Sequence, residues 1–280
     1  MEYAEFLQSK RREWTGCGIE PLPLQSVLFS FQQVLTRWAL KKGRACLWAD
    51  TGLGKTLMQV AWANQIHGRV LIIAPLCVGV QTIREAQDKL GVWVHRMESD
   101  DADDRVQITN YERLHHVNAD DYTGVVLDES SILKSVDGKT RTKLIEMFAD
   151  TPYKLCCTAT PAPNDIAELA NHCEFLGIMS RAEMLATWFV HDQDGWRLKG
   201  HATQDFYRWL VSWGLFLRKP SDLGFSDDGY DLPPLTIHQV VVGSSTPEGR
   251  GTLFPGMTDG IKGRMRVRQA TIAEKVEAAV

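Results

Sequence analysis

The sequence predicts an α/β fold in which a parallel sheet is covered by helices on both faces. Between residues 45 and 175, short runs that are apolar throughout alternate with segments of helical periodicity. Strands that are apolar on both sides are buried on both sides, and parallel strands need crossover helices between them. Such sheets bind ligands at the carboxyl ends of their strands, and the candidate motifs of this chain all follow predicted strands.

The individual elements follow from runs of apolar residues and from apolar residues at three- to four-residue intervals. Strands are expected over Arg44–Ala49, Val70–Ala74, Gln107–Thr109, Val125–Asp128 and Tyr153–Thr158. Helices are expected over Lys55–His67, Gln81–Leu90, Thr140–Phe148 and Asn164–Leu176. Strands and helices therefore alternate, as in βαβ units.

An aromatic-rich region follows over residues 181–230. Its spacing at Trp209, Trp213 and Phe216 predicts a helix, which favours an aromatic core over a platform for stacking bases. Asp-Gln-Asp-Gly between Phe189 and Lys199 predicts a hairpin. The aromatic residues are Trp188, Phe189, Trp196, Phe206, Tyr207, Trp209, Trp213 and Phe216.

The last part of the chain has weaker signals. Leu235–Val242 alternates like a strand, residues 243–260 are rich in Gly, Ser, Thr and Pro and predict a linker, and Ile261–Val280 predicts a helix that begins basic. We therefore expect one large domain over residues 1–242, with the aromatic region inside it.

Composition narrows the class of protein. The chain has 280 residues, of which 44% are hydrophobic and 24% charged, as in an ordinary globular protein. Its net charge of −4 means that any nucleic-acid contact must come from local patches. The six cysteines show no metal-binding spacing and are expected to be reduced core thiols. With no membrane-length apolar run and no signal-peptide core, we expect a cytoplasmic protein without membrane contact.

Residues 49–56 predict a phosphate-binding loop. The sequence Ala-Asp-Thr-Gly-Leu-Gly-Lys-Thr joins a predicted strand to a predicted helix. Gly52 and Gly54 would let backbone amides approach phosphate groups, and the helix N-terminus favours negative charge. Lys55 could reach the β- and γ-phosphates, and the hydroxyl of Thr56 could bind Mg²⁺. Alanine stands where this pattern usually begins with glycine.

Two further motifs follow strands at the same predicted edge. Asp128 could hold Mg²⁺ through water, and Glu129 could orient and deprotonate an attacking water. An acidic pair after a strand is a weak signal alone and a strong one after a phosphate-binding loop. Thr158 and Thr160 could bond these carboxylates and sense the γ-phosphate, although a helix cap explains them equally well.

The order of these motifs resembles that of the superfamily-two nucleic-acid-dependent ATPases, and within them the Swi/Snf-like branch, in its viral or bacterial form. The resemblance extends over residues 28 to 242. The matching segments are Leu28-Phe29-Ser30-Phe31-Gln32, residues 50–56, Ile73-Ala74-Pro75 with Gln81, Thr109-Asn110-Tyr111, Asp128-Glu129-Ser130-Ser131-Ile132-Leu133-Lys134, Thr160-Pro161 with Asn164, and Leu232-Pro233-Pro234.

The resemblance implies that residues 1–242 form the first RecA-like, ATP-binding lobe of a helicase or translocase, with ATP and Mg²⁺ as cofactors. It implies that Gln32 reads adenine, while Thr56 and Asp128 hold Mg²⁺. Ser131 stands where the family usually has histidine, a residue that helps to couple hydrolysis to nucleic acid. The implied nucleotide contacts are Gln32, Gly52, Leu53, Gly54, Lys55 and Thr56, and the implied nucleic-acid contacts are Pro75, Gln81, Thr109, Asn110 and Tyr111.

Motors of this family bind ATP between two lobes, and the second lobe supplies arginines to the reaction. The residues after Leu235 are too few for such a lobe, so we expect Ile261–Val280 to be its truncated beginning. The expected partners are therefore a nucleic acid, DNA rather than RNA, and a second lobe in the same protein or in trans.

Three functions are compatible with these motifs. The favoured one is an ATP-hydrolysing lobe of a DNA translocase or helicase, with Lys55, Asp128 and Glu129 as its catalytic residues. The alternative is a non-catalytic ATP-binding scaffold that docks on another motor. A phosphate-loop kinase is disfavoured, because it explains neither the Thr-Ala-Thr segment nor Gln32.

Overall fold

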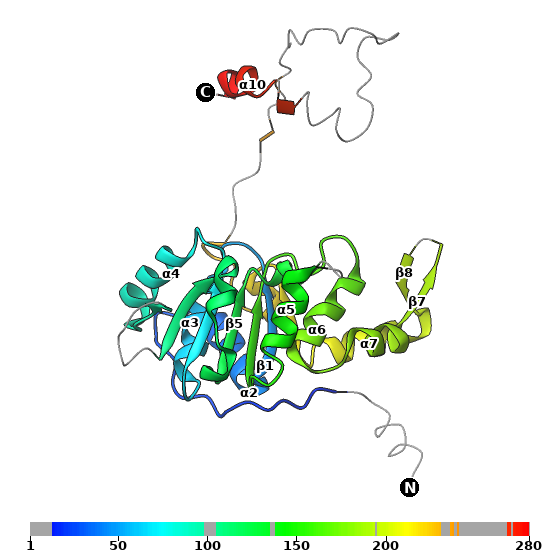
Figure 1. Cartoon of the computed structure of the whole chain (residues 1–280), viewed down its shortest axis with the longest axis horizontal. Helices are drawn as coiled ribbons and strands as arrows, with labels where there is room; N and C mark the ends of the chain where they lie inside the picture. Colours follow the sequence, from blue (N-terminus) through cyan, green and yellow to red (C-terminus); the bar gives the residue numbers. More distant parts are fainter. Residues whose placement is uncertain are drawn as a thin grey trace. The chain divides into compact units, whose positions relative to one another are not determined.

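The computed structural model describes residues 13–97, 105–134, 138–193, 195–230, 236–237, 240, 268–269 and 271–279. The chain divides into two compact units, Met1–Asp231 and Leu232–Val280. The first unit contains a seven-stranded sheet flanked by helices (Figure 1).

All neighbouring strands of this sheet run parallel, in the order β3-β4-β2-β5-β6-β1-β9. The predicted α/β class with a parallel sheet is therefore confirmed. The strands are β1 (Arg44–Ala49), β2 (Val70–Ala74), β3 (His95–Arg96), β4 (Val106–Asn110), β5 (Gly124–Asp128), β6 (Tyr153–Cys157) and β9 (Gly214–Leu217).

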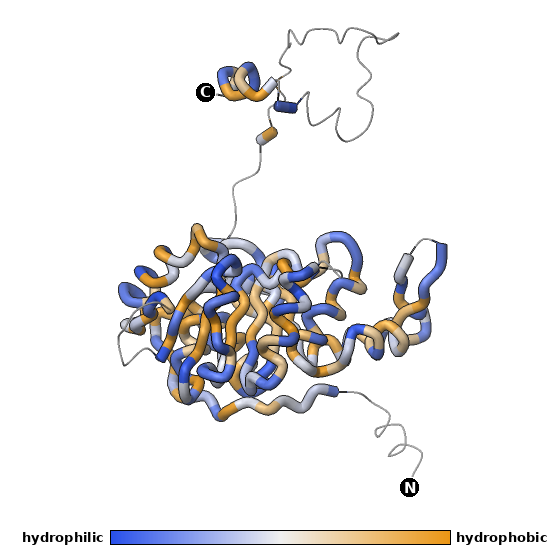
Figure 2. The backbone as a smooth tube through the Cα atoms, viewed as in Figure 1, coloured by the Kyte–Doolittle hydropathy of each residue, from blue (hydrophilic) through white to orange (hydrophobic). Residues whose placement is uncertain are grey.

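Helices cover both faces of the sheet, and the four central strands, β2, β5, β6 and β1, contribute alternate residues to two separate cores. Ile72 of β2 packs into one core and Ile73 into the other. The central strands are among the most hydrophobic parts of the chain (Figure 2), as burial on both faces requires. One face carries α2 (Ser30–Lys42), α3 (Lys55–Gln65) and α4 (Gly79–Glu85), and the other carries α5 (Lys139–Met147), α6 (Leu169–Leu176), α7 (Arg181–Trp188) and α8 (Thr203–Leu210).

Two predicted helices are divided in the structure. The helix expected over Gln81–Leu90 begins earlier, as α4, and ends in a π-helical turn over Ala86–Leu90. The helix expected over Asn164–Leu176 begins instead as a 3₁₀ turn over Ile166–Glu168, followed by α6. The Asp165 side chain accepts a hydrogen bond from the Ala167 amide, and this cap fixes the later start.

The aromatic-rich region contains α7, a hairpin of β7 (Phe189–Asp192) and β8 (Gly195–Leu198), and α8. The predicted helix through Trp209, Trp213 and Phe216 is wrong, because α8 ends at Leu210 and a turn leads into strand β9. The predicted aromatic core is nevertheless present. Its fully or nearly buried members are Trp188, Phe189, Phe206, Trp209 and Trp213.

The second unit is described only in small part. Helix α10 (Ile272–Ala279) covers the end of the helix predicted over Ile261–Val280, and Thr271, which precedes it, lies in a turn. The predicted linker over residues 243–260 lies outside the described residues, as does most of the strand predicted over Leu235–Val242. Among the described residues, no helix is long and apolar enough to cross a membrane.

Candidate site for nucleotide binding and hydrolysis

The phosphate-binding loop predicted from the sequence joins β1 to α3 at the carboxyl edge of the sheet. Gly52 and Gly54 have φ angles of 85° and 75°, a left-handed conformation that residues with side chains adopt only under strain. At Gly54 a Cβ atom would also lie 2.3 Å from Gln32 Nε2. The positive φ angle, together with this close approach to the Gln32 side chain, favours glycine at the last position before α3.

Lys55 folds back over this loop. Its Nζ atom donates hydrogen bonds to the carbonyl oxygens of Ala49, at 2.8 Å, and Asp50, at 3.1 Å. The positive charge therefore lies at the loop from which α3 begins, and the first backbone amides of that helix have no partner within it. Such an arrangement favours phosphate groups.

The acidic pair lies at the end of β5, where the backbone turns under strain at Glu129. Asp128 is the last residue of the strand, and Glu129 has a φ angle of 56°. Glu129 is the one residue other than glycine with positive φ in the described part of the chain. This conformation costs about 1–3 kcal/mol and needs support from neighbouring groups.

Hydroxyl groups hold the Glu129 side chain. Its Oε1 atom accepts hydrogen bonds from Ser131 Oγ and from Thr158 Oγ1, each at 2.7 Å. Thr158 Oγ1 in turn accepts a hydrogen bond from the Thr160 amide at 3.0 Å. The threonine segment after β6 is thus physically linked to the acidic turn after β5.

Asp128 is held from two other elements. Gln59 of α3 donates from Nε2 to Asp128 Oδ1 at 2.7 Å, and the Tyr111 hydroxyl donates to the Asp128 carbonyl oxygen at 2.6 Å. Burial raises the pKa of the Asp128 carboxyl, as does the charge of Glu129, whereas the Gln59 hydrogen bond and the charge of Lys55 lower it. Lys55 and the acidic turn are therefore electrostatic neighbours.

The residues at this edge fit a magnesium ion bound together with phosphates. Mg²⁺ prefers oxygen ligands and usually takes one or two carboxylates, several waters and substrate phosphates. Asp128 offers a carboxylate, and Thr56 offers a hydroxyl in the first turn of α3, the helix that Gln59 links to Asp128. No group of three or more His, Cys, Asp or Glu suited to a metal occurs among the residues described.

Gln32 lies under the phosphate-binding loop. Its side chain is buried, its Oε1 accepts from the Phe29 amide at 2.9 Å and its Nε2 donates to the Leu53 carbonyl at 3.0 Å. The residue expected to read adenine therefore has both amide atoms engaged within the protein.

His172 is a further buried neighbour of the acidic turn. Its Nε2 atom lies 3.1 Å from Ser130 Oγ, and its ring packs edge-on against Trp48 with 5.8 Å between ring centres. His172 therefore packs against the sheet, because Trp48 belongs to β1. Burial lowers the pKa of His172 from 6.5 to about 4, so the ring is neutral.

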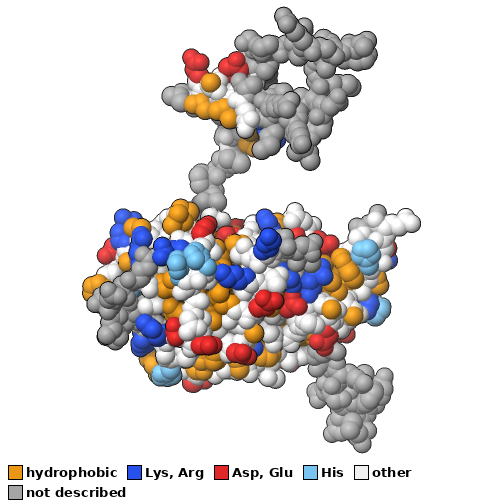
Figure 3. Space-filling model, in the orientation of Figure 1, with side chains coloured by type: hydrophobic (Ala, Val, Ile, Leu, Met, Phe, Trp, Pro, Cys, Tyr) orange, Lys and Arg blue, Asp and Glu red, His pale blue; other side chains and the backbone are white. Residues whose placement is uncertain are grey.

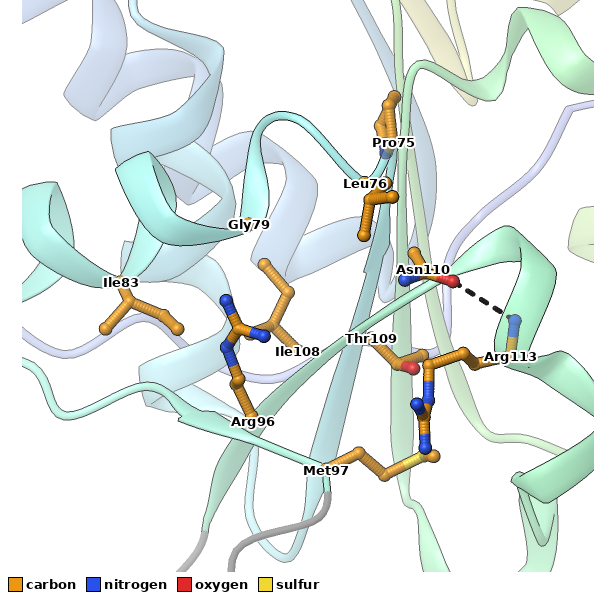
Figure 4. A pocket seen from close by; sticks show the side chains of 10 residues that line it. All are labelled: Pro75, Leu76, Gly79, Ile83, Arg96, Met97, Ile108, Thr109, Asn110 and Arg113. Atoms are coloured by element: carbon orange, nitrogen blue, oxygen red, sulfur yellow. Dashed lines mark hydrogen bonds between the residues drawn. The ribbon is translucent and has the colours of Figure 1, made fainter.

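Four of the five predicted nucleic-acid residues lie together. Pro75 follows β2, Thr109 and Asn110 end β4, and Tyr111 comes next. Pro75, Thr109 and Asn110 line one pocket (Figure 4), and Pro75 and Tyr111 line a second pocket that reaches Glu129. Gln81 lines neither; it is exposed on α4, where it bonds Glu85.

Two arginines of the first pocket were not among the predicted residues. Arg96 comes from β3, and Arg113 donates from its backbone amide to Asn110 Oδ1 at 3.1 Å (Figure 4). Figure 3 shows Lys, Arg and His side chains in a band across the upper half of one face, with most acidic side chains below it. Only the pairing of β3 with β4 brings Arg96 to this pocket, and no local sequence pattern indicates it.

Comparisons with known proteins agree with this architecture. A family model described as the SNF2-related domain matches residues 31–194. The Sulfolobus solfataricus SWI2/SNF2 ATPase core in complex with dsDNA is 20% identical, with 75% of this chain and 48% of that chain covered and a TM-score of 0.62. The Sulfolobus solfataricus SWI2/SNF2 ATPase core domain is 21% identical, with 72% of this chain and 45% of that chain covered and a TM-score of 0.56.

The chain thus spans about half the length of these solved structures. At such identities the likeness concerns the fold, which is RecA-like as in those cores. A search of curated proteins found no match.

Proposed function

The chain belongs to the SNF2-related domain family, and we propose that its first unit is the ATP-hydrolysing lobe of a DNA translocase or helicase. In this proposal the lobe binds MgATP on the loop before α3 and contacts the DNA backbone along the neighbouring strand ends. Membership of this family implies an ATPase. The roles of individual residues and the choice of DNA as the polymer are our proposal.

One observation carries the proposal: a single hydrogen bond joins the phosphate-binding helix to the acidic turn. Gln59 lies on α3, which begins with Lys55, and its side chain reaches Asp128 at 2.7 Å. Groups for binding phosphate and for activating water must surround one triphosphate, and this bond supports their meeting at one site.

The side chains suggest a division of tasks during hydrolysis. Lys55 would leave the carbonyl groups of its own loop and bind the β- and γ-phosphates. Thr56 and Asp128 would hold Mg²⁺, which supplies charge neutralisation when bound. Glu129 would accept a proton from water as the water oxygen bonds to the γ-phosphorus and the bond to the ADP oxygen breaks. Thr158, bonded to Glu129, would sense loss of the γ-phosphate.

The proposed DNA contact lies beside this site. Pro75 and Tyr111 share a pocket with Glu129, so a backbone bound there would lie close to the hydrolytic residues. The similar Sulfolobus core was solved with dsDNA, which makes dsDNA the first polymer to test. A second lobe, in the same protein or in trans, would supply the arginines that stabilise the transition state, typically worth about 10³–10⁵ in rate.

The test measures binding and turnover separately. We expect wild type to bind a fluorescent ATP analogue in Mg²⁺, Lys55→Ala to lose this binding, and Glu129→Gln to retain it. Phosphate release by wild type should be slow without a second lobe, rise when a second lobe and dsDNA are present, and stay at background in Glu129→Gln.

Two results would contradict the proposal. Equal nucleotide affinity in wild type and Lys55→Ala would place the nucleotide elsewhere. Binding without any turnover, with or without dsDNA and a second lobe, would favour the non-catalytic scaffold instead.

A further inference from the structure

Helix α3 places one polar side chain inside an otherwise apolar surface. The residues on either side of Gln59, namely Met58 and Val60, are fully buried, and Gln59 itself is only 1% exposed. A buried amide lowers stability unless it is hydrogen-bonded. The amide of Gln59 therefore needs partners, and its partners show what it does.

The partner of Gln59 is the acidic residue of the proposed magnesium site. Gln59 Nε2 donates to Asp128 Oδ1 at 2.7 Å. Cys157, which is paired with Asp128 in the register of β5 and β6, is fully buried. The amide is thus held at the buried end of β5. Lys55 lies four residues earlier, on the same side of the helix.

We infer that Gln59 is a positioning residue for the magnesium site, since it holds Asp128 by one carboxylate oxygen and leaves the other to the ion or its waters. This inference rests on the proposed function. It assigns a role to a residue outside the motif pattern, and it explains a polar side chain that packing alone would disfavour.

The chemistry of the side chain suits this role. A neutral amide donates a hydrogen bond to a carboxylate without neutralising it, so the negative charge remains available to a cation. A lysine at this position would compete with Mg²⁺ for the Asp128 carboxylate, and a glutamate would repel that carboxylate. Outer groups that orient a metal ligand typically contribute about 10–100-fold to metal affinity.

The test compares nucleotide affinity with and without the ion, using the full chain and a fluorescent ATP analogue. For each variant, the affinity in Mg²⁺ is divided by the affinity in EDTA. We expect Gln59→Met, which is similar in length but lacks the donor, to reduce this ratio by about 10-fold. Loss of packing alone would lower both affinities together, or the melting temperature, and leave the ratio unchanged.

The same helix provides a matched control. The side chain of Gln65 bonds the backbone of Leu22, with distances of 2.8 and 3.1 Å, so Gln65→Met removes a comparable amide far from Asp128 along the helix. The ratio should stay at the wild-type value in this control. If Gln59→Met does not fold, Gln59→Asn serves instead, because it keeps the amide but shortens the side chain by one methylene.

A double-mutant cycle adds a second criterion. In the Asp128→Asn background, Gln59→Met should change the ratio no further, because the carboxylate that it orients is gone. The inference would be overturned if Gln59→Met had the same ratio as wild type. It would also be overturned if Gln59→Met lowered the ratio as much in the Asp128→Asn variant as in wild type. If wild type itself binds no nucleotide, or binds it equally in Mg²⁺ and EDTA, the proposed function fails and the role of Gln59 fails with it.

Discussion

His172 is a histidine without access to solvent, placed between the acidic turn and the aromatic core. Ser130 bonds one ring nitrogen, and Trp48 packs against the ring. Charging this ring would place a cation in an apolar environment, which is why burial lowers its pKa to about 4. The protonation of His172 is therefore linked to the stability of the fold.

This linkage predicts a specific loss of stability in acid. His172 has a lower pKa in the folded chain, about 4, than its ordinary value of 6.5, so the unfolded chain binds the proton first as pH falls. The stability tied to this group is complete above about pH 6.5 and is lost towards pH 4, by roughly 3 kcal/mol. In urea unfolding between pH 4 and 7, the free energy of unfolding of His172→Gln should fall less steeply with decreasing pH than that of wild type.

An exposed histidine provides the control for this experiment. His191 lies on the surface of the β7–β8 hairpin, so His191→Gln should follow the wild-type curve. Parallel curves for wild type and His172→Gln would show that the buried ring does not titrate as described.

The sequence predicted those site residues that lie close together in the chain. Lys55 and Thr56 were predicted from one short loop, and Asp128 and Glu129 from the end of one strand; the structure places both groups at one sheet edge. Gln59 was not predicted, because it lies 69 residues from its partner Asp128. Bonds of this separation leave no periodic signal and become visible only when strand order is known.

At the scale of elements, the aromatic region acts as a second core on one face of the sheet. Trp209 packs against Trp188 and Trp213, with ring centres 5.8 and 5.3 Å apart. Phe216 lies on the edge strand β9 with 49% of its surface exposed and one ring contact, to Trp48. Whether an aromatic residue of this region is buried or exposed therefore depends on the helix or strand that carries it, and not on the type of residue.

This difference predicts unequal effects of two matched substitutions. Trp209→Ala should lower the free energy of unfolding by roughly 3–5 kcal/mol, because it empties a buried ring position. Phe216→Ala should lower it by about 1 kcal/mol, since half of the ring already contacts solvent. Chemical denaturation measures both. Similar losses in the two variants would contradict the assignment of Trp209 to the core.

The elements also show where local patterns suffice. The five predicted strands begin and end within one residue of their predicted bounds, because apolar side chains mark each of them in the sequence. β9 has only four residues, and its one aromatic residue, Phe216, continues the helical spacing of α8 by coincidence. The two-residue β3 is too short for any alternation to appear.

At the scale of the whole molecule, the candidate site is confined to one unit. The residues from Gln32 to Thr160 that form it lie in Met1–Asp231, as do all seven strands of the sheet. Among the residues that the structure describes, the members of both hydrophobic cores also come from this unit. The family resemblance predicts one lobe over residues 1–242, and this boundary stays a prediction.

This confinement predicts that residues 1–231 fold and bind nucleotide without the second unit. A fragment that retains both cores should unfold cooperatively, with a melting temperature near that of the full chain. Its affinity for a fluorescent ATP analogue in Mg²⁺ should equal that of the full chain, because every proposed nucleotide and magnesium contact is retained. A fragment ending at residue 200, which lacks α8 and β9 and so opens the sheet edge beside β1, serves as the destabilised control. If residues 1–231 lose nucleotide binding while still unfolding cooperatively, the second unit must contribute to the site, and the nucleotide contacts would have to include residues after Asp231.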